Sequence, residues 1–394
     1  MKRDYTYVIV GGGAAAASAA EAIRKRDPAG SIAIFTREWA PPYQRPPLSK
    51  EFLQNRAPLD SALMFKGEWY LENDVALHVG VEVLEIDPAR KIVKTAIGDV
   101  SYHRLLLATG ATPRTLAIPG VALDGVYTLR TYLDAERLRG VRSSAGRVVT
   151  VGSGFIGMEV AASLRSSGCE VTVVTRDDAL YATFGTDVSG YAKSLFEHHG
   201  VPILFKSSVV SIEGTERVTG VTLAGGEHIE ASAVVIGIGV LPDVSLAEKA
   251  GLHVDDGIVV DDRLRTSDAD IFAAGDVARF PGFTGKPTRV EHFDNASASG
   301  AHAGGSMAGA DASYVYVPYF WSDVFELSFE FVGSPASQAA IVTGSTESGS
   351  FILEYHAGNQ LVGALLAQRE SVERDAYRER LAQARRSTSN AGKA

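Results

Sequence analysis

Two glycine-rich turns constrain the fold of this 394-residue chain more than any other feature of its sequence. Each turn follows a β-branched run and opens a stretch of helical composition, and a second strand-like run comes after it. In chain order, the four parts lie at 8–10, 11–13, 14–26 and 32–35 in the first segment and at 148–151, 152–157, 158–165 and 171–174 in the second. The sequence therefore predicts two βαβ units, separated by one domain length.

The spacing of the glycines meets three demands of a turn that holds a dinucleotide. The turn must be tight, its backbone must approach the pyrophosphate, and the helix must pack closely against the strand. In the first turn Gly11 and Gly13 meet the first two demands, and the small Ala16 meets the third. The second turn has glycine at all three positions, Gly152, Gly154 and Gly157. Because a helix N-terminus also offers free N–H groups and a positive dipole end to phosphates, we expect two dinucleotide sites.

The strand that follows each helix commonly ends in an acidic residue that binds the ribose hydroxyls. In the first unit the acid is Glu38, one place late, and in the second unit the strand ends in Thr175 and Arg176. Arg176 is either a partner for the 2′-phosphate of NADPH or a solvent-exposed side chain. The sequence therefore leaves the choice between NADH and NADPH open.

Composition and charge exclude several other classes of protein. The length indicates two or three domains, and the net charge of −9 argues against a general affinity for nucleic acid. We expect a cytoplasmic protein with no membrane partner, because the chain has neither a signal peptide nor an apolar run of about 20 residues. Cys169 is the single cysteine, so the chain has no C-x-x-C redox pair. We expect it to be a buried structural thiol at the start of a strand.

The last 80 residues or so differ in character from the two βαβ units. Aromatic residues are concentrated at 314–321, and stretches of alternating hydrophobicity with glycine turns predict a small antiparallel sheet. These stretches lie at 327–332, 339–342, 351–355 and 361–366. The last 25 residues are rich in charge and have a helical pattern, which favours a solvated helix with a frayed tail over a docking site for an acidic partner.

Several further motifs in a fixed order resemble one known family. They lie at 45–50 (RPPLSK), 107–114 (LATGATPR), 237–242 (GIGVLP), 273–276 (AAGD) and 320–323 (FWSD). With the two glycine turns, this set resembles the FAD-dependent ferredoxin reductases of bacterial oxygenase systems, such as the putidaredoxin and rubredoxin reductases. The stretch 289–296 (RVEHFDNA) is more similar to apoptosis-inducing factor, a sister branch.

The resemblance implies an α/β fold of the glutathione-reductase kind. The chain would contain two Rossmann-like dinucleotide-binding domains and, in addition, a small α+β C-terminal domain that covers the flavin. The expected boundaries are 1–117 and 243–312 for a discontinuous FAD-binding domain, 118–242 for the NAD(P)H-binding domain and 313–394 for the C-terminal domain. The motif at 273–276 lies after the second glycine turn, as an interrupted FAD domain requires.

The resemblance also implies which residues bind the two cofactors. The expected FAD site consists of Gly11, Gly13, Ala14, Ala15, Glu38, Arg45, Lys50, Val83, Ala108, Thr109, Gly110, Arg130, Gly275, Asp276, His292 and Phe293. The expected NADH or NADPH site consists of Gly152, Gly154, Phe155, Ile156, Gly157, Glu159, Thr175, Arg176 and Gly239. Arg37 departs from the acidic or small polar residue often found at its position in the family.

Three residues are candidates for a catalytic role at the flavin. A flavin that accepts a hydride at N5 gains negative charge on its N1–C2=O edge, so nearby positive charge favours reduction. In the family a lysine beside the isoalloxazine, here Lys50, pairs with a glutamate after the second glycine turn, here Glu159. Glu159 is expected in the first turn of its helix, where the dipole favours a carboxylate. The ring of Trp321 either stacks near the cofactors or belongs to the core.

Three hypotheses for the electron acceptor remain. The first is a small iron–sulfur protein, a [2Fe–2S] ferredoxin or a rubredoxin, docked by the basic residues Arg45, Lys286 and Arg289. The second is a redox-switched protein like apoptosis-inducing factor, with slow turnover. The third is direct reduction of oxygen, quinones or dyes. The lack of a cysteine pair excludes a disulfide as acceptor. We expect a monomer or homodimer without a metal site of its own.

Overall fold

The computed structural model describes residues 3–143, 146–283, 285–336 and 338–391, and the chain divides into two compact units. The first unit consists of Met1–Arg45, Leu59–Thr112 and Leu241–Pro318. The second consists of Pro46–Pro58, Pro113–Val240 and Tyr319–Ala394. The chain passes from one unit to the other in β7 (Ala111–Pro113) and returns in β16 (Val240–Pro242), and these two strands pair. Each unit contains one of the glycine turns.

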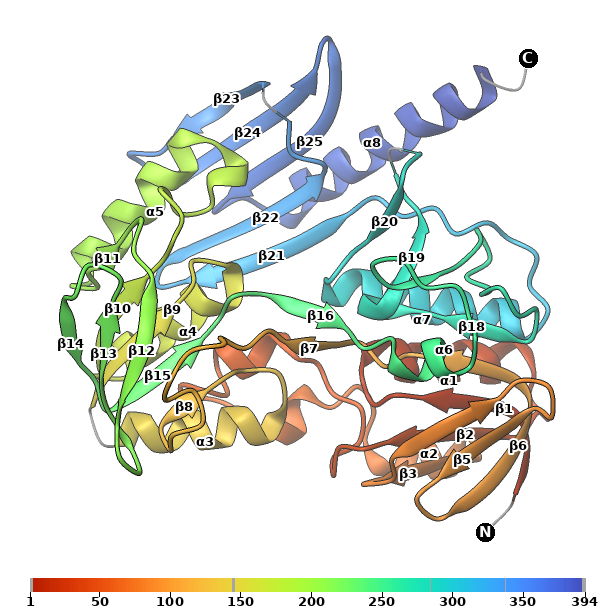
Figure 1. The fold of residues 1–394 in the computed structure, drawn as a ribbon. Coiled ribbons are helices and arrows are strands. Elements are labelled where there is room, and N and C mark those ends of the chain that lie inside the picture. The colour runs from red at the N-terminus through yellow and green to blue at the C-terminus, as the bar shows by residue number, and fades with distance from the viewer. Residues whose placement is uncertain (1–2, 144–145, 284, 337, 392–394) are drawn as a thin grey trace. The chain divides into compact units, whose positions relative to one another are not determined.

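A seven-stranded sheet forms the centre of the first unit (Figure 1). Its main path runs β3 (Val75–Val79), β2 (Ile32–Thr36), β1 (Asp4–Val10), β6 (Gly98–Leu107), β5 (Ile92–Thr95) and β4 (Val83–Asp87), and β18 (Ile271–Ala273) also pairs with β6. β1, β2, β3 and β18 run parallel to their neighbours, and β4 to β6 form an antiparallel meander. The central strands are buried on both faces, which explains their continuous β-branched and aliphatic sequences.

Two helices of the first unit pack against each other through small residues. Gly300 and Gly304 of α7 (Phe293–Met307) face Ala15 and Ala19 of α1 (Ala14–Arg26). A Cβ atom at Gly300 would lie 2.2 Å from the carbonyl oxygen of Ala15, and one at Gly304 would lie 2.4 Å from that of Ala19. The alanine-rich composition of α1 therefore follows from close helix packing, because larger residues would keep the backbones apart.

The smaller elements of the first unit surround this core. They are η2 (Leu59–Ala62), α2 (Gly67–Glu72), α6 (Ser245–Lys249), η4 (Gly275–Val277) and a three-stranded sheet of β17 (Ile258–Val259), β19 (Ala278–Pro281) and β20 (Pro287–Arg289).

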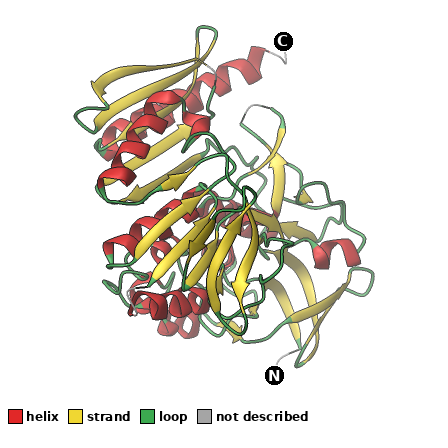
Figure 2. Ribbon diagram, turned by 60° about the vertical axis from the view of Figure 1, so that its left-hand side comes forward, coloured by secondary structure: helices red, strands yellow, loops and turns green. Residues whose placement is uncertain are grey.

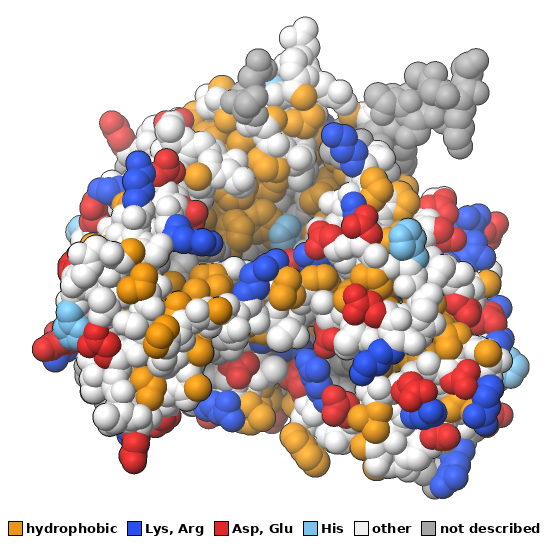
Figure 3. Space-filling view, in the orientation of Figure 1, with side chains coloured by type: hydrophobic (Ala, Val, Ile, Leu, Met, Phe, Trp, Pro, Cys, Tyr) orange, Lys and Arg blue, Asp and Glu red, His pale blue; other side chains and the backbone are white. Residues whose placement is uncertain are grey.

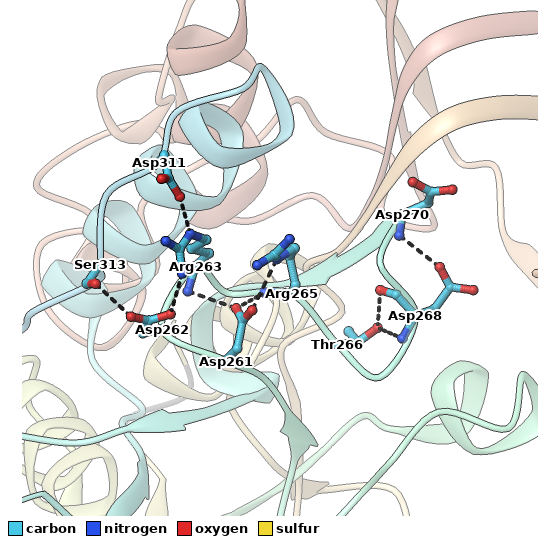
Figure 4. Close-up of polar contacts among 9 residues, drawn as sticks. All are labelled: Asp261, Asp262, Arg263, Arg265, Thr266, Asp268, Asp270, Asp311 and Ser313. Carbon is cyan, nitrogen blue, oxygen red and sulfur yellow. Dashed lines mark hydrogen bonds and ion pairs between the residues drawn. The ribbon is translucent and has the colours of Figure 1, made fainter.

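An acidic loop between β17 and β18 is fixed by its own hydrogen bonds (Figure 4). The Oδ1 atom of Asp261 accepts the backbone N–H groups of Arg263 and Arg265, and Arg263 donates to the carboxylate of Asp311 at 2.5 Å. The loop leads directly into β18 and η4, so these bonds help to position the segment that carries Gly275 and Asp276.

The second unit contains a five-stranded parallel sheet. Its order is β11 (Ile203–Leu204), β10 (Glu170–Val174), β9 (Arg147–Val151), β15 (Ala233–Ile236) and β8 (Val126–Tyr127). Its helices are α3 (Tyr132–Ser143), α4 (Phe155–Ser166) and α5 (Thr186–His198), with the short turns η1 (Pro46–Ser49) and η3 (Ala182–Phe184). A separate antiparallel sheet contains β12 (Val209–Gly214), β13 (Val218–Leu223) and β14 (His228–Glu230).

The C-terminal segment of the second unit forms an antiparallel sheet followed by a helix (Figure 2). The order is β21 (Tyr319–Val324), β22 (Leu327–Gly333), β25 (Gln360–Ala367), β24 (Ser350–Ala357) and β23 (Gln338–Ser345), followed by α8 (Ser371–Ala391). One hydrophobic cluster joins Met158 of α4 and Phe196 of α5 to Phe329 and Phe351 of this sheet. The four alternating stretches in the sequence correspond to β22–β25, so the predicted antiparallel sheet is confirmed.

The boundaries of the three domains expected from the sequence stay a prediction. Cys169 is buried, as expected, although it directly precedes β10 and does not belong to that strand.

Candidate functional site

The three glycines of the first turn are required for different reasons. A Cβ atom at Gly11, where φ is +134°, would lie 2.1 Å from the carbonyl oxygen of Ala108, and one at Gly12 would lie 2.2 Å from the Thr36 hydroxyl. A Cβ atom at Gly13 would meet nothing within 4 Å. Internal packing therefore explains the first two glycines but not Gly13, whose open side suits a ligand that approaches the backbone.

The second turn has the same pattern. At Gly152, where φ is +105°, a Cβ atom would lie 2.4 Å from the carbonyl oxygen of Gly237, and at Gly157 it would lie 2.8 Å from that of Gly152. At Gly154 the nearest atom would be 3.8 Å away. In this turn Gly152 and Gly157 are needed for the fold, and Gly154, like Gly13 in the first turn, faces open space.

Both helices that follow these turns begin without a side-chain cap. Gly13 and Gly154 are the N-cap residues of α1 and α4, and neither helix has an acidic residue in its first turn. Uncapped N–H groups beside an open glycine are suited to a phosphate. The residues present in each unit therefore fit the pyrophosphate of a dinucleotide.

In the first unit, the elements expected to hold FAD converge on the start of α1. The backbone N–H of Gly275 donates to the Ser299 hydroxyl of α7 at 2.9 Å, and a Cβ atom at Gly275 would lie 3.1 Å from the Cβ of Ala15. Asp276 follows in η4, and Phe293 begins α7. Ala15, Gly275 and Ser299, which lie far apart in the sequence, are thereby brought together near the start of α1.

Glu38 and Arg45 form an ion pair in the same unit. The guanidinium of Arg45 lies 2.6 Å from Oε1 of Glu38, and the Tyr43 hydroxyl donates to Oε2 at 2.5 Å. Burial acts to lower the pKa of Arg45, but Tyr43 and Glu38 raise it above its usual value. Both oxygens of Glu38 therefore already accept hydrogen bonds, and a ribose hydroxyl would have to share them.

In the second unit, Lys50 and Glu159 form a buried ion pair. The ammonium of Lys50 lies 3.1 Å from Oε1 of Glu159, and both side chains are less than 10% exposed. The same ammonium lies 3.5 Å from Oδ2 of Asp323 and 5.7 Å from the centre of the Trp321 ring. Lys50 directly after η1, Glu159 in α4 and Trp321 in β21 are the three predicted catalytic residues, and they thus lie next to one another.

The hydrogen bonds of Glu159 correct one sequence expectation. The helix α4 begins at Phe155, so Glu159 lies in its second turn and not in the first. The helix dipole is weaker there. Instead, Glu159 accepts hydrogen bonds from the hydroxyls of Ser49, at 2.5 Å, and Ser322, at 2.7 Å, in addition to its contact with Lys50.

Comparison with known proteins establishes the family. A family model described as pyridine nucleotide-disulphide oxidoreductase matches residues 5–300. The chain belongs to this family. Rhodocoxin reductase of Rhodococcus erythropolis is 37% identical over 362 residues, which are 90% of this chain and 84% of that protein. Rubredoxin-NAD(+) reductase of Pseudomonas putida is 36% identical over 332 residues, covering 83% and 86%.

A solved structure of similar fold is the covalent putidaredoxin reductase–putidaredoxin complex. The match has a TM-score of 0.91 at 30% identity and covers 96% of this chain and 93% of that chain. Membership of the pyridine nucleotide-disulphide oxidoreductases confirms the expected class of enzyme: the chain is an oxidoreductase with FAD and NAD(H) as its cofactors. It also confirms the expected fold, with two Rossmann-like parts and a sheet-rich C-terminal part.

Sequence reasoning missed one acidic residue at the second turn. Asp177 lies two residues after Thr175, and its Oδ2 accepts the hydroxyl of Ser153 at 2.5 Å and that of Thr175 at 3.2 Å. Arg176 and Asp177 are both exposed, and no cation pairs with Asp177 among the described residues. The signal was present in the Asp177-Asp178 pair, but the sequence could not show that the chain turns back toward Ser153.

The other predicted site residues lie at the ends of strands or helices. Ala14 is buried at the start of α1 and Val83 at the start of β4, and Ala108 follows β6. Thr109 donates its hydroxyl to the carbonyl oxygen of Asp243 at 2.7 Å. Gly110 and Gly239 have positive φ angles of 71° and 95°.

Four further predicted residues lie beside helix N-termini. The backbone N–H of Arg130 donates to the carboxylate of Asp134, just before α3. The ring of Phe155 stacks against Tyr181 at 5.4 Å, whereas Ile156 is 47% exposed. His292 is the N-cap residue of α7, and burial lowers its pKa to about 4.

The role of the basic residues Arg45, Lys286 and Arg289 in docking stays a prediction, and two of the three already form ion pairs within the first unit. Arg289 pairs with Asp256 and Glu291, and its side chain is 11% exposed. Arg45 pairs with Glu38. Lys286 is exposed. On the face drawn in Figure 3, acidic and basic side chains are interspersed.

Two features are absent from the described residues. No helix in this part of the chain is both long and apolar enough to cross a bilayer. No group of three His, Cys, Asp or Glu side chains in the same ranges is arranged to hold a metal ion.

Proposed function

We propose that this oxidoreductase takes electrons from NADH onto FAD and passes them singly to a small iron–sulfur protein of the ferredoxin or rubredoxin type. When bound, the flavin can accept two electrons as a hydride and release them one at a time. The observation that carries the proposal is the buried pair of Lys50 and Glu159, with Asp323 and Trp321 beside it.

Lys50 is proposed to present positive charge to the flavin. Of its three N–H groups, two are accounted for among the described residues by Glu159 and Asp323. The third is available to an acceptor on the cofactor. The buried position of the ammonium strengthens its interaction with any charge that develops nearby, because water is excluded.

The choice of a protein as electron acceptor rests on two supports. Cys169 is the single cysteine and is buried, so the chain has no cysteine pair of its own to reduce. The names of the relatives describe reductases of rhodocoxin and rubredoxin, and the similar solved structure is a complex with putidaredoxin. We propose an acceptor of the same chemistry for this chain.

We further propose that NADH is the preferred donor. The carboxylate of Asp177 is held at the second glycine turn by the hydroxyls of Ser153 and Thr175. A carboxylate there can accept hydrogen bonds from ribose hydroxyls and would repel the 2′-phosphate of NADPH. Arg176 is adjacent and exposed, but no hydrogen bond holds it at the turn among the described residues.

The test is anaerobic stopped-flow mixing of the FAD-loaded protein with NADH. We expect the flavin absorbance to bleach and then to recover quickly on mixing with a [2Fe–2S] ferredoxin or a rubredoxin. Replacing Lys50 by Met should slow the bleaching, whereas replacing the exposed Lys66 by Met should not. Protein without flavin absorbance or FAD uptake would contradict the proposal. A persistent long-wavelength band with no response to either acceptor would favour the redox-switched alternative.

A further inference from the structure

The carboxylate of Glu159 accepts two hydrogen bonds from hydroxyl groups in addition to its ion pair with Lys50. Glu159 is 3% exposed, and a buried carboxylate is costly unless hydrogen bonds and opposite charge compensate it. Its Oε1 contacts both the Lys50 ammonium and the Ser322 hydroxyl, and its Oε2 contacts the Ser49 hydroxyl. Both oxygens are therefore fixed, from two different segments of the chain.

Ser322 is placed by a strand and not by a flexible loop. It is fully buried in β21, and its backbone is paired with Phe329 of β22. Its hydroxyl donates to Glu159 at 2.7 Å, a length typical of a hydrogen bond to a charged acceptor. Because the strand backbone is fixed, it sets where this donor lies and hence where the carboxylate can lie.

Ser49 is held from both ends. Its hydroxyl donates to Glu159 at 2.5 Å, and its backbone carbonyl accepts the hydroxyl of Ser163 at 2.6 Å. Ser163 in turn accepts a hydrogen bond from the side-chain amide of Gln54 at 2.9 Å. This chain of bonds joins the Pro46–Pro58 segment to α4, which carries Glu159.

The position of Lys50 follows from how these donors are shared. Its ammonium lies between two carboxylates, the buried Glu159 and the 37% exposed Asp323. If Glu159 had no other donor, it would attract the ammonium more strongly and draw it away from Asp323. Because two hydroxyls already donate to the Glu159 carboxylate, its attraction for the Lys50 ammonium is weaker.

We infer that Ser322 and Ser49 are positioning residues that hold the Glu159 carboxylate by both oxygens and so keep the Lys50 ammonium in the one arrangement that assists hydride transfer. This inference rests on the proposed role of Lys50 at the flavin. It does not depend on which protein accepts the electrons.

The test compares Ser322→Ala with a matched control, Ser189→Ala. Ser189 is also buried in the second unit, and its hydroxyl donates to the carbonyl oxygen of Leu180. We expect S322A to slow flavin reduction at saturating NADH by about tenfold or more, as the loss of a hydrogen bond to a charged group implies. We expect the NADH dissociation constant to be unchanged, and S189A to change neither.

A double-mutant cycle shows whether Ser322 acts through Glu159. In a Glu159→Gln background, S322A should have little further effect on the reduction rate, because the charged acceptor has been removed. The midpoint potential of the flavin, measured against a redox dye with dithionite, should shift in S322A and not in S189A. If S322A does not retain FAD, Ser49→Ala takes its place in the same cycle.

Three results would overturn the inference. One is a reduction rate in S322A equal to that of S189A. Another is a loss that appears only as weaker NADH binding, and the third is a loss of the same size in the Glu159→Gln background. Failure of any ferredoxin to reoxidise the flavin would contradict the proposed acceptor and leave these measurements valid, because they use NADH and dithionite alone.

Discussion

Replacing Gly154 by alanine should separate ligand binding from folding. Gly154 has φ of −70° and ψ of 168°, which alanine adopts without strain, and its new Cβ would have 3.8 Å to the nearest atom. Alanine is less favourable than glycine at an N-cap by about 0.5–1 kcal/mol, and the reduced freedom of the unfolded chain offsets most of this cost. We therefore expect the free energy of unfolding to change by less than about 1 kcal/mol.

The same methyl group should weaken NADH binding. It would occupy the open space beside the uncapped start of α4, where we expect the pyrophosphate. Crowding of a well-packed contact costs about 1–3 kcal/mol, so the dissociation constant for NADH should rise by about tenfold or more. The assay is the dependence of the rate of flavin reduction on NADH concentration, together with urea unfolding.

Gly152→Ala is the matched control, because its Cβ would lie 2.4 Å from the carbonyl oxygen of Gly237 at a φ of +105°. This variant should lose about 2 kcal/mol or more of stability. If G154A binds NADH as tightly as the unmodified protein, the open side of Gly154 does not face the ligand. If G154A unfolds as readily as G152A, the packing argument is wrong.

Three further predictions follow from other sites. Replacing Asp177 by Ser should raise kcat/KM for NADPH relative to NADH by about tenfold or more, because a negative charge that repels the 2′-phosphate is removed. The adjacent Asp178→Ser is the control, and equal shifts in both variants would contradict the role of Asp177. His292 has a folded pKa of about 4 against an ordinary 6.5, so between these values the unfolded chain binds a proton that the folded chain does not. Stability should therefore fall as pH falls from 6.5 to 4, by up to about 3 kcal/mol, and urea unfolding of His292→Asn should show a shallower slope; an identical slope would refute this. Cys169 is 0% exposed, so Cys169→Ala should retain NADH-dependent reduction of the acceptor at about 1 kcal/mol lower stability, and lost activity with normal FAD content would point to a redox role for the thiol.

Features that depend on neighbours along the chain were predictable from the sequence. The two glycine turns are an example, because a tight strand-to-helix turn restricts which residue can occupy each position. The antiparallel strands β22–β25 were also predictable, since their alternating pattern reflects one buried face. The start of α4 was predicted three residues late, because no capping side chain marks it.

Contacts between distant segments were decided only by the tertiary structure. Ser49 and Ser322 lie 110 and 163 residues from Glu159, and nothing in their local sequence shows that both donate to the same carboxylate. The family resemblance indicated that Lys50 and Glu159 form a pair, but it indicated no role for either serine. Nor could the sequence show that Asp177 turns back to Ser153, because a loop sets its direction through hydrogen bonds that form after folding.

The sequence by itself therefore determined that the chain has two places for a dinucleotide, because glycine spacing is a local steric requirement. The tertiary structure decided how the charged side chains beside the second glycine turn are arranged. Lys50, Glu159 and Asp323 come from three separate segments, and their distances are set by the packing of η1, α4 and β21. Electrostatic interaction depends on distance and burial, and neither is a property of the sequence alone.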